Sequence, residues 1–391
     1  MARSRRAAAT AEPVAESFAA NRRRLAMMTR VTKDMGDWRP AAEVLREIEA
    51  VPTRFLQYDV ATGVGGHPIS RITLLHGPSG HGKTKFALGL GESFLRREHF
   101  FGLLDAERTT PVSWVRQLMR EIVTSPGFVA LPASSYEKAV EGMRVFCTKI
   151  DAARGKLDQD LTALAVVDSI RSLQPAEMMK LAMNAAAVDG EKKKFGRRGG
   201  KKGIDGVGGR SGQIKAHLNS VWVDELVPLL ADTRIAAVLV TREFDDEDAG
   251  FFDEGVKVGG GKGLYFGASL VVRVTSSFVY EGAEGAKRCV GECHHVAIRK
   301  TKLSGKLEPV TRANFYTSNG VDHPEGFWPE RDALEIAEEC GVVDLKGSWY
   351  SFAGKRLGNG RTGALKRLAD EPALLAEIEG AVRETTRKRP A

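Results

Sequence analysis

Eight residues at positions 77–84, "GPSGHGKT", have the types and spacing that phosphate binding requires. They fit the pattern G-x-x-x-x-G-K-[ST] between an expected strand, "RITLLHG", and an expected helix, "KFALGLGESFLRR". The glycines let backbone N–H groups converge on phosphate oxygens, and the helix N-terminus adds partial positive charge. Lys83 can bridge the β- and γ-phosphates, and the Thr84 hydroxyl can hold Mg²⁺. A chance match in a glycine-rich turn is the alternative, which the flanking elements disfavour. The residues expected to contact a nucleotide are Gly77, Pro78, Ser79, Gly80, His81, Gly82, Lys83, Thr84 and Lys85.

Two carboxylates follow strand-like runs further along the chain. Asp168 ends the apolar run "LTALAVVDS", where it is placed to hold the Mg²⁺ of a bound nucleotide together with Thr84. A helix N-cap or turn aspartate is the alternative role. Glu107, in "LLDAER", comes about one β-α unit after the phosphate loop. A carboxylate there could orient and deprotonate an attacking water, so Glu107 is a candidate catalytic base.

The elements that must position these residues alternate along the chain. Strand-like and helical runs alternate from residue 70 to about 315, which predicts a mostly parallel sheet with helices on both faces. Residues 14–50 have apolar and charged positions at helical spacing and predict an N-terminal helical arm. From about residue 320 the pattern changes to helix, short hairpin, helix, helix, which predicts a separate small α/β domain.

Composition limits the protein classes that the chain can represent. The 391 residues are 42% hydrophobic and 28% charged, which is typical of a globular protein with one large core and small additional domains. A net charge of +8 permits nucleic-acid binding without establishing it. No run approaches the roughly 18 apolar residues of a membrane span, so no membrane partner is expected. The four scattered cysteines favour a reducing compartment.

A cysteine and histidine cluster lies in the stretch "KRCVGECHHVAIRK". Its members are Cys289, Cys293, His294 and His295. A zinc site usually requires two separated ligand pairs. The β-rich pattern therefore favours a plain strand or hairpin over metal binding.

Several motifs in order resemble the RecA family of bacterial and phage recombinases. "PTRFLQYDVATGVGGHPISRITLLHGPSGHGKT" resembles the start of that family's P-loop ATPase core, and "LLDAERTTPVSWVRQL" resembles the segment with its catalytic glutamate. The resemblance implies that Glu107 is this base and that Trp114 stacks on adenine, while the family's adenine-contacting acid is replaced by Pro111. "AVVDSIRSLQP" resembles the Walker B strand and puts Asp168 and Ser169 in register.

The resemblance continues to about residue 385. "KVGGGKGLYFGASLVVRV" resembles the end of the second DNA-binding loop, which implies DNA contacts for Gly260, Gly261 and Lys262. "VAIRKTK" resembles the strand whose two lysines reach a neighbouring subunit's ATP, which implies catalytic roles for Lys300 and Lys302 beside Lys83. "AEECGVVDLKGSWYSFAGKRLGNGRTGALKRL" is similar to the family's C-terminal pattern.

The implied fold is α/β: a RecA-type P-loop ATPase core with a mostly parallel twisted sheet, an N-terminal helical arm and a small C-terminal α/β domain. The expected boundaries are 1–50 for an arm that mediates oligomerisation, 51–318 for the core and 319–391 for the small domain, where contact with duplex DNA is expected. The DNA-binding loops are expected at about 174–212 and 243–262.

The segment "GEKKKFGRRGGKKG", residues 190–203, falls in the first of these loops. Its cations are expected to neutralise DNA phosphates: Lys192, Lys193, Lys194, Arg197, Arg198, Lys201 and Lys202. The alternative is a solvated insertion without a specific role.

The implied function is an ATP-dependent DNA recombinase that forms filaments on single-stranded DNA and catalyses homologous pairing and strand exchange in recombination and repair. It would use ATP and Mg²⁺, bind single- and double-stranded DNA, assemble with itself into a helical homo-oligomer, and work in the cytoplasm of a bacterium or phage-infected cell. A hexameric DNA helicase on the same core and a non-catalytic recombination mediator are the alternatives.

The sequence departs from the family in two places. The family's γ-phosphate sensor position falls on Arg242 or Glu243, in "VTRE", and one sequence leaves the two open. The family's acidic C-terminal tail is missing, since the chain ends "RETTRKRPA".

Overall fold

The computed structural model describes residues 22–31, 47–133, 135–157, 159–176, 205–245, 256–282, 286–303, 311–317, 320 and 323–387. The chain divides into two units, residues 1–48 and 49–391. In the first unit, residues 22–31 form a helix that exposes Leu25, Met28 and Val31. The helical arm predicted for residues 14–50 is wrong at its C-terminal end. Ala50 lies in β1 (Ala50–Val51), which pairs with β2 (His67–Pro68).

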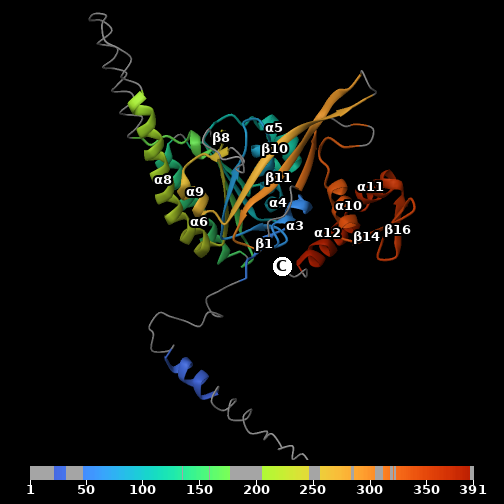
Figure 1. The fold of residues 1–391 in the computed structure, drawn as a ribbon, viewed down its shortest axis with the longest axis horizontal. Helices are drawn as coiled ribbons and strands as arrows, with labels where there is room; N and C mark the ends of the chain where they lie inside the picture. The colour runs from blue at the N-terminus through green and yellow to red at the C-terminus, as the bar shows by residue number, and fades with distance from the viewer. Residues whose placement is uncertain are drawn as a thin grey trace, which may run out of the picture. The chain divides into compact units, whose positions relative to one another are not determined.

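A large central sheet organises the second unit (Figure 1). It has nine strands in the order β13-β12-β11-β10-β3-β7-β6-β4-β5. The six strands from β10 to β5 are parallel, and β11, β12 and β13 extend the sheet antiparallel beyond β10. The strand bounds are β3 (Ile72–His76), β4 (Phe100–Asp105), β5 (Phe128–Leu131), β6 (Ala163–Asp168), β7 (Ile235–Val240), β10 (Leu270–Glu281), β11 (Arg288–Thr301), β12 (Thr311–Tyr316) and β13 (Gly326–Phe327). The prediction of a mostly parallel α/β sheet is confirmed.

Helices cover both faces of this sheet because its central strands are apolar on both sides. Leu75 of β3 packs in one core with Phe86 of α4 (Lys83–Leu95) and the helix α5 (Val112–Met119). Leu74, its neighbour, packs in a second core with α6 (Tyr136–Arg154) and α8 (Asp205–Thr233). The predicted start of α8 near Gln213 is wrong: the helix begins at Asp205, across glycines whose low helix propensity hides it in the sequence.

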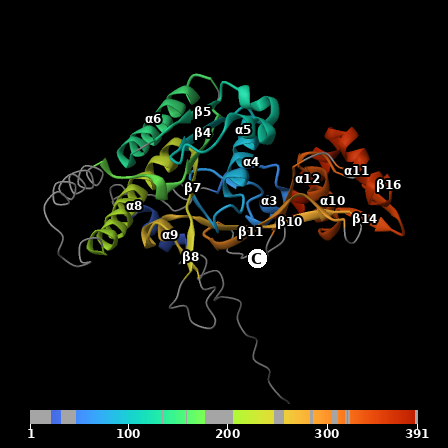
Figure 2. The ribbon, with the colours of Figure 1, turned by 90° about the horizontal axis from the view of Figure 1, so that it is seen from above.

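The C-terminal part has a core of its own around three helices, α10 (Pro329–Glu339), α11 (Gly360–Asp370) and α12 (Pro372–Arg387). A three-stranded antiparallel sheet accompanies them, formed by β14 (Val343–Lys346), β15 (Trp349–Phe352) and β16 (Lys355–Asn359). Seen from above, these helices lie at the opposite end of the unit from α6 and α8 (Figure 2).

An ion pair joins the C-terminal helix to the start of the core. Arg383 of α12 donates to Oδ2 of Asp59 in α3 (Leu56–Ala61), at 2.9 Å from Nη2 and 3.1 Å from Nε. Asp59 is fully buried and also accepts bonds from the Thr53 N–H at 2.8 Å and the Thr53 hydroxyl at 2.6 Å. Burial raises the pKa of Asp59 to about 7, against the lowering by Arg383 and Thr53.

Candidate functional site

Four neighbouring strands end at one hollow of about 200 Å³. Parallel strands place their carboxyl ends on one edge of a sheet, and here β3, β7, β6 and β4 lie side by side. Each strand end contributes a charged side chain to the hollow: Lys83 after β3, Arg242 after β7, Asp168 at the end of β6 and Glu107 after β4. The sheet order therefore brings together residues that are far apart in the sequence.

Glycines shape the phosphate loop between β3 and α4. Gly80 and Gly82 both have φ of +81°, in the left-handed region that favours glycine, and Gly82 is the N-cap of α4. A Cβ at Gly82 would lie 2.1 Å from Cε1 of the buried His294 of β11. The loop therefore rests directly on the antiparallel extension of the sheet.

The Lys83 ammonium lies against its own loop, donating to the carbonyl oxygens of Gly77 at 3.0 Å and Pro78 at 2.6 Å. Burial lowers its pKa, while the Asp168 charge acts in the opposite direction. The Thr84 hydroxyl donates to Oδ2 of Asp168 at 2.5 Å, and Asp168 is 7% exposed. Burial raises the pKa of Asp168 to about 6, against the lowering by the Thr84 hydrogen bond. A buried carboxylate beside a hydroxyl is an oxygen donor set that suits Mg²⁺.

Two predicted phosphate-loop side chains are bound to β10 and β11, although Lys85 also lines the hollow. His81 Nδ1 accepts a hydrogen bond from the Ser276 N–H of β10 at 2.9 Å, so this imidazole ties the loop to the hairpin strand. Lys85 donates to Oε2 of Glu292 in β11 at 2.7 Å and lies over the Phe315 ring of β12, 4.7 Å from its centroid. Contact of the backbone N–H groups of His81 and Lys85 with a nucleotide stays a prediction.

The Glu107 carboxylate accepts three hydrogen bonds at Oε1. The donors are the hydroxyls of Ser169 at 2.8 Å and Ser172 at 3.1 Å, and Nη2 of Arg242 at 3.3 Å. Burial raises the pKa of Glu107, but the serine hydrogen bonds and the Arg242 charge outweigh it, so the pKa lies below the usual range. Glu107 is thus ionised at neutral pH, as a base must be. Ser172, in the 3-10 turn Ile170–Ser172 after β6, was missed by sequence reasoning.

The structure separates the two residues that the sequence left open at the end of β7. Arg242 lines the hollow, and its side chain is 40% exposed. The Glu243 side chain is 6% exposed and accepts two bonds from Arg273 of β10, at 2.8 and 2.9 Å. His76 Nδ1 lies 3.2 Å from the same carboxylate. Glu243 is therefore bonded to partners on β10 and β3 and does not line the hollow, whereas Arg242 does.

Trp114 lines the hollow from α5, half-buried, in the position where stacking on a base was predicted. Pro111, which precedes α5, is exposed. Residue 111 therefore offers no carboxylate beside Trp114, and contact of Trp114 with a nucleotide base stays a prediction.

Lys300 and Lys302 bind the end of a short helix of their own chain. Lys300 Nζ donates to the carbonyl oxygens of Tyr265, Phe266 and Ala268 at 2.5, 3.2 and 3.0 Å, and Lys302 Nζ donates to Phe266 O at 2.8 Å. These carbonyls lie at the C-terminus of α9 (Lys262–Gly267), where cations are favourable. Neither lysine lines the hollow of its own chain.

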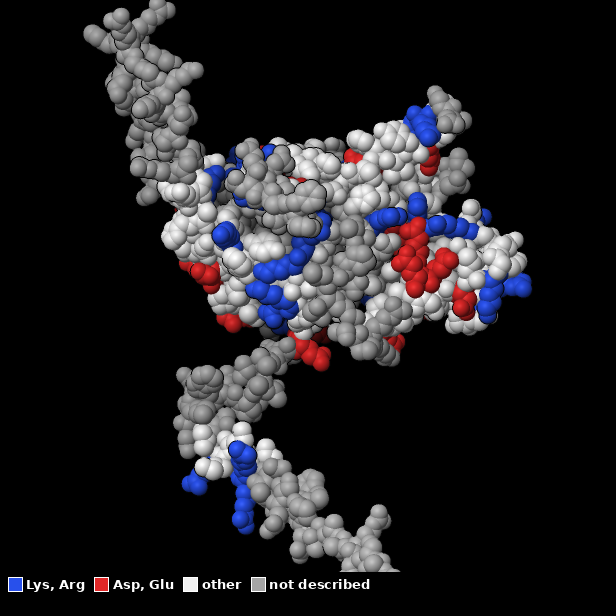
Figure 3. Space-filling view, in the orientation of Figure 1, with Lys and Arg blue, Asp and Glu red and all other residues white. Residues whose placement is uncertain are grey.

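Gly260 and Gly261 form the turn that leads into α9. Their φ values are +97° and +93°, and the Gly260 carbonyl accepts a bond from Asn219 of α8 at 2.8 Å. A Cβ at Gly261 would lie 2.7 Å from that of Ala216, so the turn packs tightly on α8, while Lys262 is exposed. On the face shown in Figure 3, lysine and arginine side chains gather over the region of α9.

The cationic segment 190–203 and its seven predicted DNA contacts lie outside the described residues, as do 246–255 of the second predicted loop. The described ends of that loop form a small ladder, β8 (Glu243–Asp245) with β9 (Val256–Val258).

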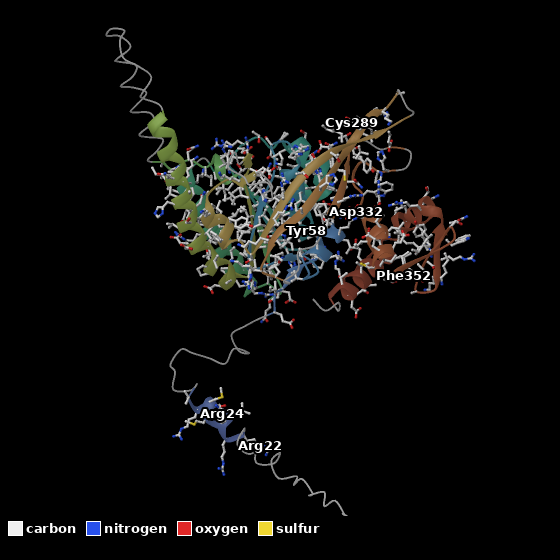
Figure 4. The ribbon with its side chains drawn as sticks, in the orientation of Figure 1. Arg22, Arg24, Tyr58, Cys289, Asp332 and Phe352 are labelled. Atoms are coloured by element: carbon white, nitrogen blue, oxygen red, sulfur yellow. The ribbon has the colours of Figure 1, made fainter. Side chains whose placement is uncertain are left out.

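The cysteine and histidine cluster lies on β11, so the prediction of a plain strand or hairpin is confirmed. Cys289 is exposed toward the distal end of the β10–β11 hairpin (Figure 4), whereas His294 is buried and its pKa is lowered by burial to about 4. His295 Nε2 lies 3.1 Å from the Ser277 hydroxyl. Across the described ranges, no group of three or more histidine, cysteine, aspartate or glutamate side chains could hold a metal ion. None of the helices described is long and apolar enough to cross a membrane.

Comparison with known proteins identifies two matching family models. The RecA N-terminal domain matches residues 38–195, and the RecA C-terminal domain matches residues 332–387. Among similar proteins, "Protein RecA" of Geobacter sulfurreducens is 27% identical over 342 residues, which cover 88% of this chain and 87% of that protein. "Protein RecA" of Syntrophus aciditrophicus is 26% identical over 350 residues, with 90% and 88% covered, and that of Thermus thermophilus is 27% identical over 343 residues, with 87% and 86% covered.

Proposed function

Because the chain belongs to the RecA family, we propose that it is an ATP-dependent DNA recombinase that forms filaments on single-stranded DNA and catalyses homologous pairing and strand exchange. Hydrolysis of ATP would be DNA-dependent and coupled to exchange. The observation that carries this proposal is the meeting of Lys83, Thr84, Asp168 and Glu107 at one hollow. These residues supply a phosphate-binding ammonium, an Mg²⁺ donor pair and an ionised base.

Each residue has one task in the proposed reaction. The Lys83 ammonium exchanges its two loop carbonyls for phosphate oxygens, and the loop N–H groups bind the same phosphates. Thr84 and Asp168 would hold Mg²⁺, which when bound neutralises phosphate charge. Glu107, held in orientation by Ser169 and Ser172, accepts the proton of the attacking water.

The remaining predicted residues complete the proposal beyond a single chain. Lys300 and Lys302 reach the nucleotide of a neighbouring protomer in a helical assembly that the N-terminal arm joins. The segments 174–212 and 243–262 bind single-stranded DNA, with the cations of 190–203 on phosphates. Residues 319–391 contact the incoming duplex.

Electron microscopy with single-stranded DNA, Mg²⁺ and a slowly hydrolysed ATP analogue tests the proposal. Open helical filaments together with DNA-stimulated phosphate release are expected. Closed rings would indicate a hexameric helicase instead. Separate particles with no DNA-stimulated turnover would indicate a non-catalytic mediator. The matched control is Lys83→Ala, in which the filaments that depend on bound nucleotide should be lost.

A further inference from the structure

A cleft of about 960 Å³ lies between the C-terminal end of α4 and the helices α10 and α11. Among the residues that the structure describes, it shares no lining side chain with the phosphate hollow. We propose that this cleft binds a small oligophosphate, a molecule with at least two linked phosphate groups, between arginine clusters on its two walls. The proposal adds an anion site that is separate from the nucleotide site.

The first cluster, the core triad, consists of Arg54, Glu92 and Arg96. The Glu92 side chain is 2% exposed, and its Oε1 accepts bonds from Arg96 at 2.9 Å from Nε and 2.7 Å from Nη2. Its second oxygen, Oε2, accepts from Nη1 of Arg54. The Arg54 guanidinium also lies over the Phe327 ring of β13, 4.9 Å from its centroid. One buried carboxylate therefore holds two guanidinium groups, and one positive charge is left in excess.

The second cluster, the C-terminal triad, repeats this arrangement with Arg331, Glu335 and Arg361. Oε1 of Glu335 accepts a bond from Nε of Arg331 at 3.1 Å and another from Nη2 of Arg361. Arg331 also donates from Nη1 to the Tyr316 hydroxyl at 3.0 Å and lies 5.8 Å from the centroid of the Trp328 ring. This triad likewise has one positive charge in excess.

Each triad contains an inner arginine, which contacts an aromatic ring, and an outer arginine, which is more exposed. The inner side chains, Arg54 and Arg331, are 18% and 32% exposed, whereas the outer ones, Arg96 and Arg361, are 53% and 45% exposed. The inner arginine alone can neutralise the glutamate. The outer arginine, whose guanidinium has five N–H donors, can then donate to a phosphate as well.

The remaining charges of the cleft favour an anion of more than one charge. Besides the four arginines of the triads, Arg97 and Lys366 line the cleft, and both are exposed. The lining glutamates are Glu92, Glu330 and Glu379. Cations thus outnumber carboxylates on the lining, and a concave surface of one sign attracts the opposite charge from solution. Guanidinium groups bind phosphate through parallel N–H donors, which suits an oligophosphate.

The size of the cleft and the position of the triads favour a small molecule over a nucleic acid. A volume of about 960 Å³ falls within the range of about 300–1,000 Å³ that small-molecule sites occupy. The duplex contact proposed for residues 319–391 would involve the C-terminal triad without the core triad. A small ligand between the walls uses both triads at once and would link α4 to α10 and α11.

Isothermal titration with inorganic tripolyphosphate tests the proposal on the full chain with Lys83→Ala, which weakens the competing phosphate loop. In that protein, Arg96→Gln and Arg361→Gln each remove an outer arginine and leave a neutral arginine–glutamate pair. Each change should weaken tripolyphosphate binding about 10- to 100-fold, because one charge-assisted contact is lost. The matched control is Arg367→Gln on α11, outside the cleft, where binding should change by less than about twofold.

Thermal unfolding separates a lost ligand contact from a damaged fold. Without ligand, the cleft variants should unfold at nearly the temperature of the Lys83→Ala protein, because the substituted side chains are exposed. Tripolyphosphate should raise the unfolding temperature of the Lys83→Ala protein and should raise it less in the two cleft variants.

Titration of ATP into the same protein identifies the source of the phosphate groups. Tighter binding of ATP than of tripolyphosphate would identify a nucleotide, since the half-buried Trp328 offers an aromatic face in the cleft. Equal or weaker binding would identify an inorganic oligophosphate.

Two results would overturn the proposal. One is a Lys83→Ala protein that does not bind tripolyphosphate, or that binds it equally in the cleft variants and the control. The other is a loss in Arg361→Gln alone, which would exclude a ligand shared by the two walls. If duplex DNA binding fell in the same variant, Arg361 would belong to the duplex surface instead. Either result leaves the proposed recombinase function standing.

Discussion

Replacing Arg383 with methionine should destabilise the protein in a pH-dependent way. The variant leaves Asp59 fully buried without its cation, with only the hydrogen bonds of Thr53. Breaking a buried ion pair from one side typically costs about 3–5 kcal/mol, because an uncompensated charge remains in the core. The carboxyl of the variant can escape that cost by staying protonated, so at pH 8, about one unit above the pKa of Asp59, the penalty exceeds that of the lost hydrogen bonds by at most about 1.4 kcal/mol.

The sign of the pH dependence follows from the raised pKa of Asp59, about 7 in the folded protein. Because the folded state binds this proton more tightly than the unfolded chain does, stability falls as pH rises from about 4 toward 7 and then levels. Without Arg383 the pKa of Asp59 rises further, so the loss continues above pH 7 at up to about 1.4 kcal/mol per pH unit. At pH 6 the carboxyl is largely protonated in both proteins, and the cost shrinks to the lost hydrogen bonds, about 1–2 kcal/mol.

Urea unfolding at pH 6 and pH 8 measures both penalties. The control is Arg367→Met, which removes an exposed arginine from its pair with Glu371 and should change stability by less than about 1 kcal/mol at either pH. Equal penalties for Arg383→Met at the two pH values would refute the reasoning, since they would mean that Asp59 does not change its protonation between them.

Three further changes test the proposed reaction. Glu107→Gln should bind nucleotide within about twofold of the unmodified chain and lose about 10²–10⁴-fold in hydrolysis, measured by phosphate release; an unchanged rate would exclude Glu107 as the base. A double variant, Lys300→Ala with Lys302→Ala, should inhibit mixtures with unmodified protein beyond its mole fraction, because the site is shared between protomers; linear dilution of ATPase activity would contradict sharing. Replacing the seven cations of 190–203 with serine should flatten the plot of log affinity for single-stranded DNA against log salt by about 3, if roughly four phosphates are engaged at about 0.7 each; superimposable plots would mean that this segment does not hold DNA.

Local patterns were sufficient to predict the strand ends that carry chemistry. The phosphate loop and Asp168 are signalled by residues adjacent in sequence, and parallel strands put their ends on one edge whatever their order. The sequence could not decide whether Arg242 or Glu243 faces the hollow, because the answer depends on which of them finds a buried partner. That partner, Arg273, lies 30 residues away on β10.

Side-chain direction around the loop was equally hidden. His81 and Lys85 belong to the phosphate motif by position, yet their side chains bind β10 and β11, which are joined to the loop only in three dimensions. The start of α8 was misplaced for a different reason. Its first turns contain several glycines, and the low helix propensity of glycine predicts no helix there.

The capping of α9 by Lys300 and Lys302 has a consequence for the order of events in an assembly. In the proposed assembly, the carbonyl end of α9 and a neighbour's nucleotide compete for the same two ammonium groups. A nucleotide that recruits them leaves the last carbonyls of the helix without their donors, at the element that directly follows Gly260 and Gly261. Faster hydrogen exchange in α9 on triphosphate binding would reveal that transfer. Each subunit contact would then remove hydrogen bonds from the C-terminus of α9. Assembly itself would therefore change the stability of the helix at which the predicted DNA-binding segment 243–262 ends.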